Sequence, residues 1–374
     1  MLRKILTTAS VVLSTCGIAM AADSTTAAKT PPPVSISGSV DGYYRYNFDD
    51  PKGGTNNKTS FTNSQNSFEL GMATLRADHS FGKVSATADL GFGRRAAEFS
   101  YNDSASNQNL AAIKQLYVTY QATSKIKFTL GKWGTHIGYE VLDAYSNRNY
   151  SMDYMFSYGP FFHTGIKADV TLSGTTAFMV GVANPTDFSS TSSSTKVAIA
   201  QFSTGTKDGK WKGYLNYQGY YGVSTPYVLN SGTAYTLYKN LSQIDLVVNG
   251  TLNSKWGIGY NGTYQAINDG SSKDWWGSAL YLNYDPKSNL GFTLRGEYFS
   301  DKDGIKLAQF DGDPYKGDVT DFTLTALWKV ESNLTIMPEI RLDNTSKDGF
   351  FAKSNGVTST NSTVSALVAA VYKF

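Results

Sequence analysis

The stretch VTDFTLTALWKV, residues 319–330, alternates apolar and polar side chains along an extended chain. Its apolar positions are Phe322, Leu324, Ala326, Trp328 and Val330, and its polar positions include Asp321, Thr323, Thr325 and Lys329. Successive side chains of a β-strand point to opposite sides, so this period of two predicts a strand. One face of the strand meets an apolar environment and the other face a polar one.

The same alternation continues on both sides of this stretch, from Val34 onward, and is clearest in residues 334–343, 290–299 and 241–252. We predict about sixteen strands, near residues 34–48, 67–80, 83–95, 113–122, 126–134, 163–172, 175–184, 196–204, 210–222, 241–252, 255–267, 275–284, 290–300, 319–330, 333–346 and 363–374. Alternation is weakest at 67–80 and 196–204. In the former, the apolar phase slips after Met72, which indicates a β-bulge.

The connections alternate between short and long along the whole chain. The short ones are residues 81–82, 123–125, 173–174, 206–209, 253–254, 285–289 and 331–332. The long ones are residues 49–66, 96–112, 135–162, 185–195, 223–240, 268–274, 301–318 and 347–362. Tight turns at one rim and long loops at the other are typical of outer-membrane β-barrels.

A soluble sandwich or solenoid would also alternate, with its apolar face turned into a core. Three features favour a membrane barrel: an even number of strands, a final strand that runs to Phe374, and apolar faces that end in aromatic residues as interfacial girdles do. Those residues are Tyr44, Tyr46, Phe48, Trp256, Tyr264, Tyr284, Trp328 and Tyr372. We therefore predict an all-β fold over residues 34–374: a transmembrane antiparallel up-and-down β-barrel of about 16 strands, with short periplasmic turns and long extracellular loops.

The composition excludes other classes of protein. Charged residues make up 17% and aromatic residues 14% of the 374 residues. A helical membrane protein is excluded, because each of its spans needs about 20 consecutive apolar residues. A disordered protein is excluded, because disordered chains are poor in aromatic residues. The formal net charge of +3 provides no basic stripe, so we predict no nucleic-acid partner.

Residues 1–21 have the anatomy of a secretory signal peptide, with Arg3 and Lys4 before an apolar stretch and the small-x-small triplet Ala19-Met20-Ala21. A lipoprotein signal at Cys16 is the alternative. Residues 22–33 are rich in Thr, Ala and Pro and predict a spacer. Cleavage before Ala22 would remove the only cysteine, so we expect neither disulfides nor thiolate metal sites.

The polar phase predicts the lining of the barrel. Lys329 or Arg341 turned toward lipid at mid-bilayer would cost about 2–4 kcal/mol each, so the polar faces point inward. Sixteen strands enclose an interior too wide for side chains to fill, which predicts a water-filled channel. The predicted lumen-lining residues are Arg45, Lys167, Asp169, Arg295, Glu297, Glu339 and Arg341, with Asp41, Tyr43, Lys114, Lys210, Lys212, Asp245, Asp321 and Asp343. Their mixed signs predict modest ion selectivity.

The long connection 135–162 is dense in Tyr, Phe and Met, which a solvent-washed loop would not normally expose. We predict that it folds into the barrel and narrows the channel. The predicted constriction residues are Tyr139, Glu140, Asp143, Arg148 and Asp153. The alternative is that the loop packs on the barrel rim or against another protomer.

Several segments carry a family resemblance. They are VDGYYRYNF (40–48), NSFELG (66–71), LGKW (130–133), GYE (138–140), NYS (149–151) and PFFHTG (160–165). The chain resembles the OmpL-like β-barrel porin family, type 2, which implies an outer-membrane diffusion channel. Met152 and Asp153 follow NYS where the resemblance implies a basic residue. The final Tyr372-Lys373-Phe374 is similar to the signal read by the barrel-assembly machinery.

The sequence holds little that indicates catalysis. His79, His136 and His163 are the only histidines, and none lies within metal-ligand spacing of another. Residues 91–96 match G-x-G-x-x-A, but an alternating strand explains both glycines. We predict no enzyme, cofactor or metal. An outer-membrane hydrolase using His136 or His163 is a weak alternative without a G-x-S-x-G elbow.

The expected function is a porin in the outer membrane of a bacterium with two membranes, through which small hydrophilic solutes and ions diffuse passively. Expected partners are outer-membrane lipid, the assembly machinery and small hydrophilic solutes, with self-association left open. The competing function is a non-conducting barrel that acts as an adhesin or structural anchor through its long loops.

Overall fold

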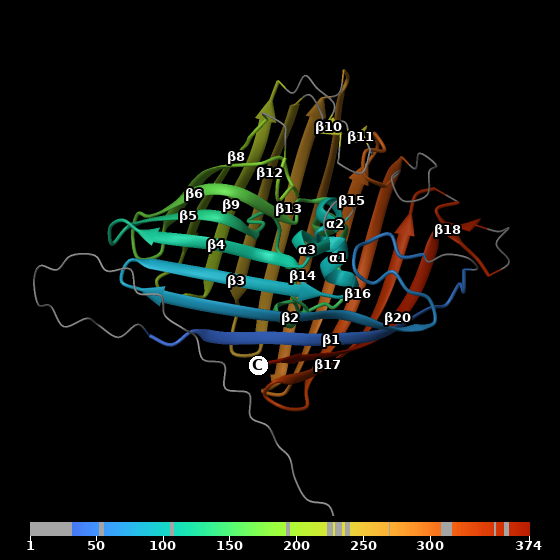
Figure 1. The fold of residues 1–374 in the computed structure, drawn as a ribbon. Helices are drawn as coiled ribbons and strands as arrows, with labels where there is room; N and C mark the ends of the chain where they lie inside the picture. The colour runs from blue at the N-terminus through green and yellow to red at the C-terminus, as the bar shows by residue number, and fades with distance from the viewer. Residues whose placement is uncertain are drawn as a thin grey trace, which may run out of the picture. The chain divides into compact units, whose positions relative to one another are not determined.

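The fold is a closed antiparallel barrel, seen in a computed structural model that describes residues 32–51, 56–104, 108–191, 195–222, 227–228, 234–235, 240–268, 270–307, 316–347, 349–354 and 359–374. The signal peptide predicted at 1–21 and most of the spacer lie outside these residues. Each barrel strand pairs with the next along the chain, and the last pairs with the first (Figure 1). The predicted sixteen-strand barrel is confirmed.

The barrel strands correspond one to one with the predicted segments. They are β1 (Ser35–Asn47), β2 (Ser67–Phe81), β3 (Val84–Phe92), β4 (Ile113–Gln121), β5 (Ile126–Gly134), β6 (Phe162–Thr171), β7 (Ala177–Ala183), β8 (Val197–Gly205), β9 (Trp211–Tyr221), β12 (Asn240–Thr251), β13 (Trp256–Asn268), β14 (Ser272–Lys287), β15 (Leu290–Asp301), β16 (Gly317–Lys329), β17 (Leu334–Thr345) and β20 (Ser362–Lys373). The largest difference in bounds is at β14, which is longer at both ends than predicted.

The prediction of a long loop at residues 268–274 is wrong. Strand β13 runs to Asn268, and that residue pairs with Ser272 at the start of β14. Polar residues at this point indicated a loop. They instead continue the hydrogen-bonded ladder, because a strand can extend beyond the apolar belt with polar side chains on both faces.

Short elements occupy the connections after β3, β5, β9 and β17. The helices are α1 (Arg94–Phe99), α2 (Tyr101–Ser104), α3 (Gln108–Ala111), η1 (Ala144–Ser146) and α4 (Tyr154–Tyr158), and two small sheets pair β10 (Tyr227–Val228) with β11 (Ala234–Tyr235) and β18 (Phe351–Ala352) with β19 (Ser359–Thr360). Among the described residues, no helix has the length and apolar character to span a membrane.

The predicted bulge in β2 lies at Gly71. Asp41 of β1 pairs with Met72, whereas the next residue, Gly42, pairs with Leu70. A side chain at Gly71 would collide with the carboxylate of Asp41 and the hydroxyl of Tyr150. Glycine therefore permits both the change of phase and the close approach of the loop that carries Tyr150.

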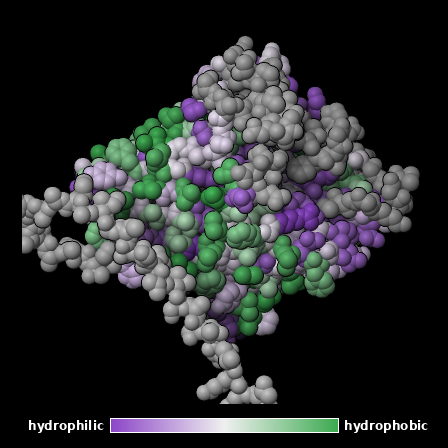
Figure 2. All heavy atoms as spheres, in the orientation of Figure 1, coloured by the Kyte–Doolittle hydropathy of each residue, from purple (hydrophilic) through white to green (hydrophobic). Residues whose placement is uncertain are grey.

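The outward phase is apolar, as predicted. Phe322, Leu324 and Trp328 of β16 have exposed fractions of 54%, 46% and 52%, whereas Asp321, Thr323 and Thr325 are fully buried. Figure 2 shows hydrophobic side chains over much of the strand surface. The apolar faces therefore point away from the barrel interior.

The inward phase is not uniformly polar. A group of residues that we call the inner apolar cluster packs inside the long-loop ends of the strands. Its members are Trp133, Tyr154, Met155, Tyr158, Met179, Val197, Ile199, Tyr220, Leu241, Ile267, Trp275, Ala279, Tyr281, Phe299, Ile305, Leu307, Val319, Phe350 and Phe351. Three loop segments, including α4, thus pack against the strands within one buried cluster.

Candidate functional site

The segment between β5 and β6, residues 135–161, contacts inward-facing residues on opposite sides of the barrel. Its first part crosses toward β9, β12 and β13. The Nε2 atom of His136 lies 3.1 Å from the carbonyl oxygen of Tyr217. The backbone N–H groups of Gly138 and Tyr139 donate to Asp245 and Asn261.

The middle of the segment reaches the opposite wall. Asn149 donates to Thr325 of β16 at 2.7 Å, and the backbone N–H of Tyr150 donates to Glu339 of β17 at 2.8 Å. The Tyr150 hydroxyl donates to Asp41 of β1 at 2.5 Å. These partners all belong to the inward phase, so the segment lies against the inner wall rather than on the rim.

Helix α4 is anchored at its N-terminus. Asp153 caps the helix by accepting from the backbone N–H of Phe156 at 2.6 Å. The carboxylate of Glu297 on β15 accepts the backbone N–H groups of Tyr154 and Met155, at 2.7 and 2.9 Å. Unpaired N–H groups of a first helical turn favour such an acceptor.

Two buried guanidinium groups connect the segment to the wall. Arg295 contacts Glu140 and Asp321 at 2.7 and 2.6 Å and donates to the backbone carbonyl of Ser151. Arg341 contacts Asp343 at 2.7 Å and donates to the carbonyl of Met152 at 2.7 Å. Both side chains are at most 4% exposed.

Carboxyl groups gather on the loop side of this network. Asp153 donates its backbone N–H to Glu140, and the hydroxyl of Tyr281 donates to the Asp153 carboxylate. Burial and the neighbouring Asp153 raise the pKa of Glu140 to about 8, while Arg295 opposes the rise. Burial likewise raises the pKa of Asp153, against the opposing effect of Arg295.

The raised pKa of Glu140 predicts that docking of the loop, and with it the conductance, depends on pH. The pKa of Glu140 in the docked loop, about 8, lies above its ordinary value of 4.5, so docking favours the protonated carboxyl. That stabilisation is fully present below pH 4.5 and is lost as the pH rises through about 8. We expect single-channel conductance to be larger and noisier at pH 9 than at pH 6.

The matched variant for this test is Glu140→Gln, which keeps the hydrogen-bonding shape without a titrating group. Its conductance should change little between the two pH values. Equal pH responses in the native protein and this variant would contradict the assignment to Glu140.

The structure separates the predicted constriction residues. Glu140 and Asp153 lie together, and Tyr139 stacks on Tyr281 with ring centroids 4.1 Å apart. Asp143 instead contacts Lys114 of β4 at 2.6 Å, and Arg148 contacts Asp285 near the short-turn end of β14 at 2.7 Å. The five residues therefore do not meet at one point, and their role in narrowing the channel stays a prediction.

The predicted lumen-lining residues lie on the inner face of their strands, in two environments. The segment 135–161 contacts four of them, Arg295, Glu297, Glu339 and Arg341. Arg45 donates to the carbonyl of Ser64, in another buried segment. Lys167 and Asp169 of β6 contact one another at 3.7 Å and are 19% and 32% exposed.

Sequence reasoning missed Tyr281, Asp285 and the inner apolar cluster. Tyr281 occupies the inward phase between Leu280 and Leu282, so the alternation itself was the available signal. Phe299 and Val319 likewise share the phase of Glu297 and Asp321. Apolar residues in a polar phase were not recognised as inward-facing.

The histidines form no recognisable catalytic or metal site. The ring centroids of His136 and His163 lie 5.1 Å apart, although the two residues are 27 positions apart in the sequence. Burial lowers the pKa of His136 to about 4. His79 contacts the carbonyl of Pro32 near the short-turn rim. No group of three or more His, Cys, Asp or Glu able to hold a metal occurs within the described ranges.

Comparison with known proteins adds an independent result. A family model described as beta-barrel porin-2, OmpL-like, matches residues 33–374. A search of curated protein sequences found no match.

Solved structures with similar folds include three outer-membrane barrels, each matched over 91% of this chain. The outer membrane channel DcaP of Acinetobacter baumannii is 13% identical, with a TM-score of 0.59 over 97% of that chain. The anion-selective porin from Comamonas acidovorans is 11% identical, with a TM-score of 0.58 over 99% of its chain. OmpT of Vibrio cholerae in its trimer form is 11% identical, with a TM-score of 0.53 over 99% of its chain. These likenesses concern the barrel fold.

Proposed function

Because the chain belongs to the OmpL-like beta-barrel porin-2 family, we propose that it forms a water-filled outer-membrane channel for passive diffusion of small hydrophilic solutes and ions. The observation that supports the proposal is a closed barrel with an apolar outside and inward-facing charges. Closure pairs the backbone within hydrocarbon and leaves an enclosed polar interior. The proposal assigns the barrel no catalytic role.

Exposure of the inner wall indicates where water enters. The side chains of Lys127 and Asp169, on β5 and β6, are 45% and 32% exposed. Arg295 and Asp321, on the loop-covered wall, are fully buried. We propose that the passage follows the β5–β9 side, and that the segment around Glu140 narrows it from the other side.

The test is single-channel recording of the purified full-length protein in a planar bilayer. Stable openings whose current is proportional to voltage are the expected result. Protein that is folded, as judged by heat-modifiable gel mobility, and yet never conducts would overturn the proposal.

A specific observation favours a second candidate. Phe299, Trp275 and Tyr158 belong to the inner apolar cluster, which packs within the long-loop end of the barrel. If it closes the passage, the protein is a non-conducting barrel that acts through its long loops as an adhesin or anchor. Persistent silence of folded protein, with binding of intact cells to a host or matrix surface, would support it.

Export and assembly are part of the same proposal. Residues 1–21 would direct export, lipid would surround the apolar face, and the assembly machinery would recognise Tyr372-Lys373-Phe374. Self-association is included because OmpT of Vibrio cholerae, a structurally similar barrel, is described in a trimer form.

Deletion of Phe374 is expected to reduce folded barrel in the outer membrane several-fold. The backbone N–H of Phe374 donates to Gly38, and its carbonyl accepts from Gly38, both at 3.0 Å, where the last strand meets the first. The deletion removes these closing bonds together with the terminal aromatic residue. Heat-modifiable mobility in outer-membrane fractions measures the loss.

Phe374→Tyr keeps the ring and the backbone bonds and should assemble normally. Equal amounts of folded barrel with and without Phe374 would contradict the proposed role of this terminus.

A further inference from the structure

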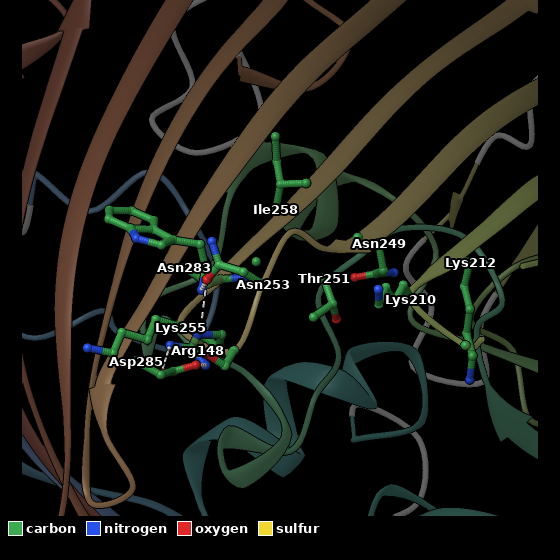
Figure 3. A pocket seen from close by; sticks show the side chains of 15 residues that line it. Arg148, Lys210, Lys212, Asn249, Thr251, Asn253, Lys255, Ile258, Asn283 and Asp285 are labelled. Atoms are coloured by element: carbon green, nitrogen blue, oxygen red, sulfur yellow. Dashed lines mark hydrogen bonds and ion pairs between the residues drawn. The ribbon is translucent and has the colours of Figure 1, made fainter.

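A cavity of about 340 Å³ lies inside the short-turn rim, between the β8–β9, β12–β13 and β14 ends. Its lining includes Arg148, Lys210, Lys212 and Lys255. Figure 3 shows Lys255 and Arg148 on one side of it, with Lys210 and Lys212 on the other. Side chains from three parts of the barrel wall and from the inner loop segment thus meet at one opening.

The cavity carries uncompensated positive charge. Asp285 holds Arg148 at 2.7 Å, and Asp208 lies 3.6 Å from Lys210. Within the described part of the chain, no carboxylate lies within ion-pair distance of the ammonium groups of Lys212 and Lys255. These two lysines therefore add a positive field that no neighbouring acid cancels.

The strand register places this charge on the inner wall. Lys212 of β9 pairs with Asn249 of β12, and Asn249 pairs in turn with Gly259 of β13. All three belong to the inward phase of their strands, alternating with outward residues such as Leu215 and Leu246, which are 51% and 41% exposed. The Lys212 ammonium group consequently faces solvent within the barrel mouth rather than lipid, and Lys255 lines the same cavity from the turn before β13.

Neutral donors accompany the lysines. The side-chain oxygen of Asn253 accepts the backbone N–H groups of Lys255 and Trp256, at 2.9 and 3.0 Å. The Asn283 oxygen accepts from the Thr293 hydroxyl at 2.8 Å. With its oxygen engaged, the Asn253 amide has its N–H₂ group left to donate, and such a group suits an oxyanion.

The rest of the barrel interior provides the contrast. On the loop-covered wall the cations are paired, as in Arg295 with Asp321 and Arg341 with Asp343. Mixed charges in sequence predicted modest selectivity, but pairing cancels much of the charge on that wall. Arg45 on the same wall contacts the backbone carbonyl of Ser64, whereas Lys212 and Lys255 line an open cavity at the short-turn mouth.

We propose that this cavity binds small polyvalent anions that carry carboxylate or phosphate groups. Lysine ammonium groups and amide N–H₂ groups form charge-assisted hydrogen bonds to such oxygens, and a cationic mouth raises the local concentration of anions. A volume of about 340 Å³ suits a small molecule. The inference rests on the proposed channel for its transport role, but binding itself does not require conduction.

The first test is isothermal titration calorimetry of the detergent-purified full-length protein with pyrophosphate, and separately with citrate, at low ionic strength. We expect saturable binding of at least one anion. The variant Lys212→Glu/Lys255→Glu should weaken it at least tenfold, and salt should weaken it in the native protein. The two probes distinguish phosphate from carboxylate recognition.

The matched control is Lys83→Glu/Lys125→Glu. These lysines lie in the turns after β2 and β4, at the same rim but outside the cavity lining, and the substitution changes the net charge equally. This variant should bind anions as the native protein does. Heat-modifiable mobility verifies that both variants are folded.

The second measurement is the reversal potential in a potassium chloride gradient. The native channel should prefer chloride, and the Lys212→Glu/Lys255→Glu variant should shift toward potassium. Absence of binding by both anions, or equal weakening in the two double variants, would overturn the inference. Anion binding by a protein that never conducts would overturn the channel proposal and leave the site intact.

Discussion

Replacement of Arg295 with Met is expected to release the inner loop segment and to raise single-channel conductance several-fold. Arg295 is fully buried, contacts Glu140 and Asp321, and donates to the carbonyl of Ser151. Methionine fills similar space but removes the guanidinium from Glu140 and Asp321, and Asp321 keeps only the longer contact with Arg341, at 3.5 Å. Removing one partner of a buried ion pair costs about 3–5 kcal/mol, which here opposes docking of the loop.

The control for Arg295 is Lys127→Met, which removes a cation from the inner wall of β5. Lys127 is 45% exposed, and its partner Asp169 lies 3.6 Å away, so water solvates both groups when the contact is lost. Because Lys127 lines the proposed passage, we expect a small change in conductance but no release of the loop. The conductance of Arg295→Lys should lie between those of the native protein and Arg295→Met, because a lysine keeps the charge but loses the forked geometry.

Protease sensitivity adds a second measurement for the Arg295→Met variant. Release of the loop should expose residues 135–161 to cleavage, while the barrel resists. A folded Arg295→Met protein with native conductance and native protease resistance would show that Arg295 does not hold the loop.

Replacement of Phe299 with Ala is expected to open the long-loop end and increase conductance. The Phe299 ring lies 5.2 Å from that of Trp275, 5.4 Å from Tyr158 and 5.7 Å from Tyr154, measured between centroids. Truncation of a buried Phe to Ala costs about 3–5 kcal/mol through lost contacts and the remaining cavity. The weakened contacts include those that hold α4 on the wall.

Two variants make the Phe299 test specific. Phe299→Leu retains most of the apolar volume and should stay near native conductance. Phe322→Ala removes the same ring from the lipid-facing phase of β16, where the residue is 54% exposed, and should leave conductance unchanged. If Phe299→Ala and Phe322→Ala behave alike, the inner apolar cluster does not restrict the passage.

The Phe299→Ala variant also distinguishes the two candidate functions. A native protein that is silent, together with a conducting Phe299→Ala variant, would identify a barrel closed by its own apolar contacts. A native protein that conducts, with larger openings after Phe299→Ala, would identify a channel that the same contacts merely narrow.

The strands were predictable because their signal is local. Each strand crosses between lipid and an enclosed interior, so the two phases must differ at every second residue. Even the bulge was visible in sequence, since apolar residues move from Phe68 and Leu70 to Ala73 and Leu75 across Gly71. The loop 268–274 was misassigned because polarity beyond the apolar belt does not distinguish a strand end from a turn.

The arrangement of the site was only partly predictable. The inward phase of Arg295, Glu297 and Arg341 followed from alternation. Their pairing with Glu140 and the carbonyls of Ser151 and Met152 did not, because those partners lie on a loop whose path is set by many distant contacts. The separation of Arg148 from Asp153 has the same origin.

The sequence by itself determined the strand number, the apolar outside and the rims of short and long connections, because a bilayer imposes these as repeated local requirements. Only the tertiary structure decided which interior charges are cancelled. Arg295 and Lys212 both stand in a polar phase, yet one is buried among carboxylates and the other faces an open cavity. That difference depends on which loop and strand residues meet across the barrel, and alternation along one strand carries no information about it.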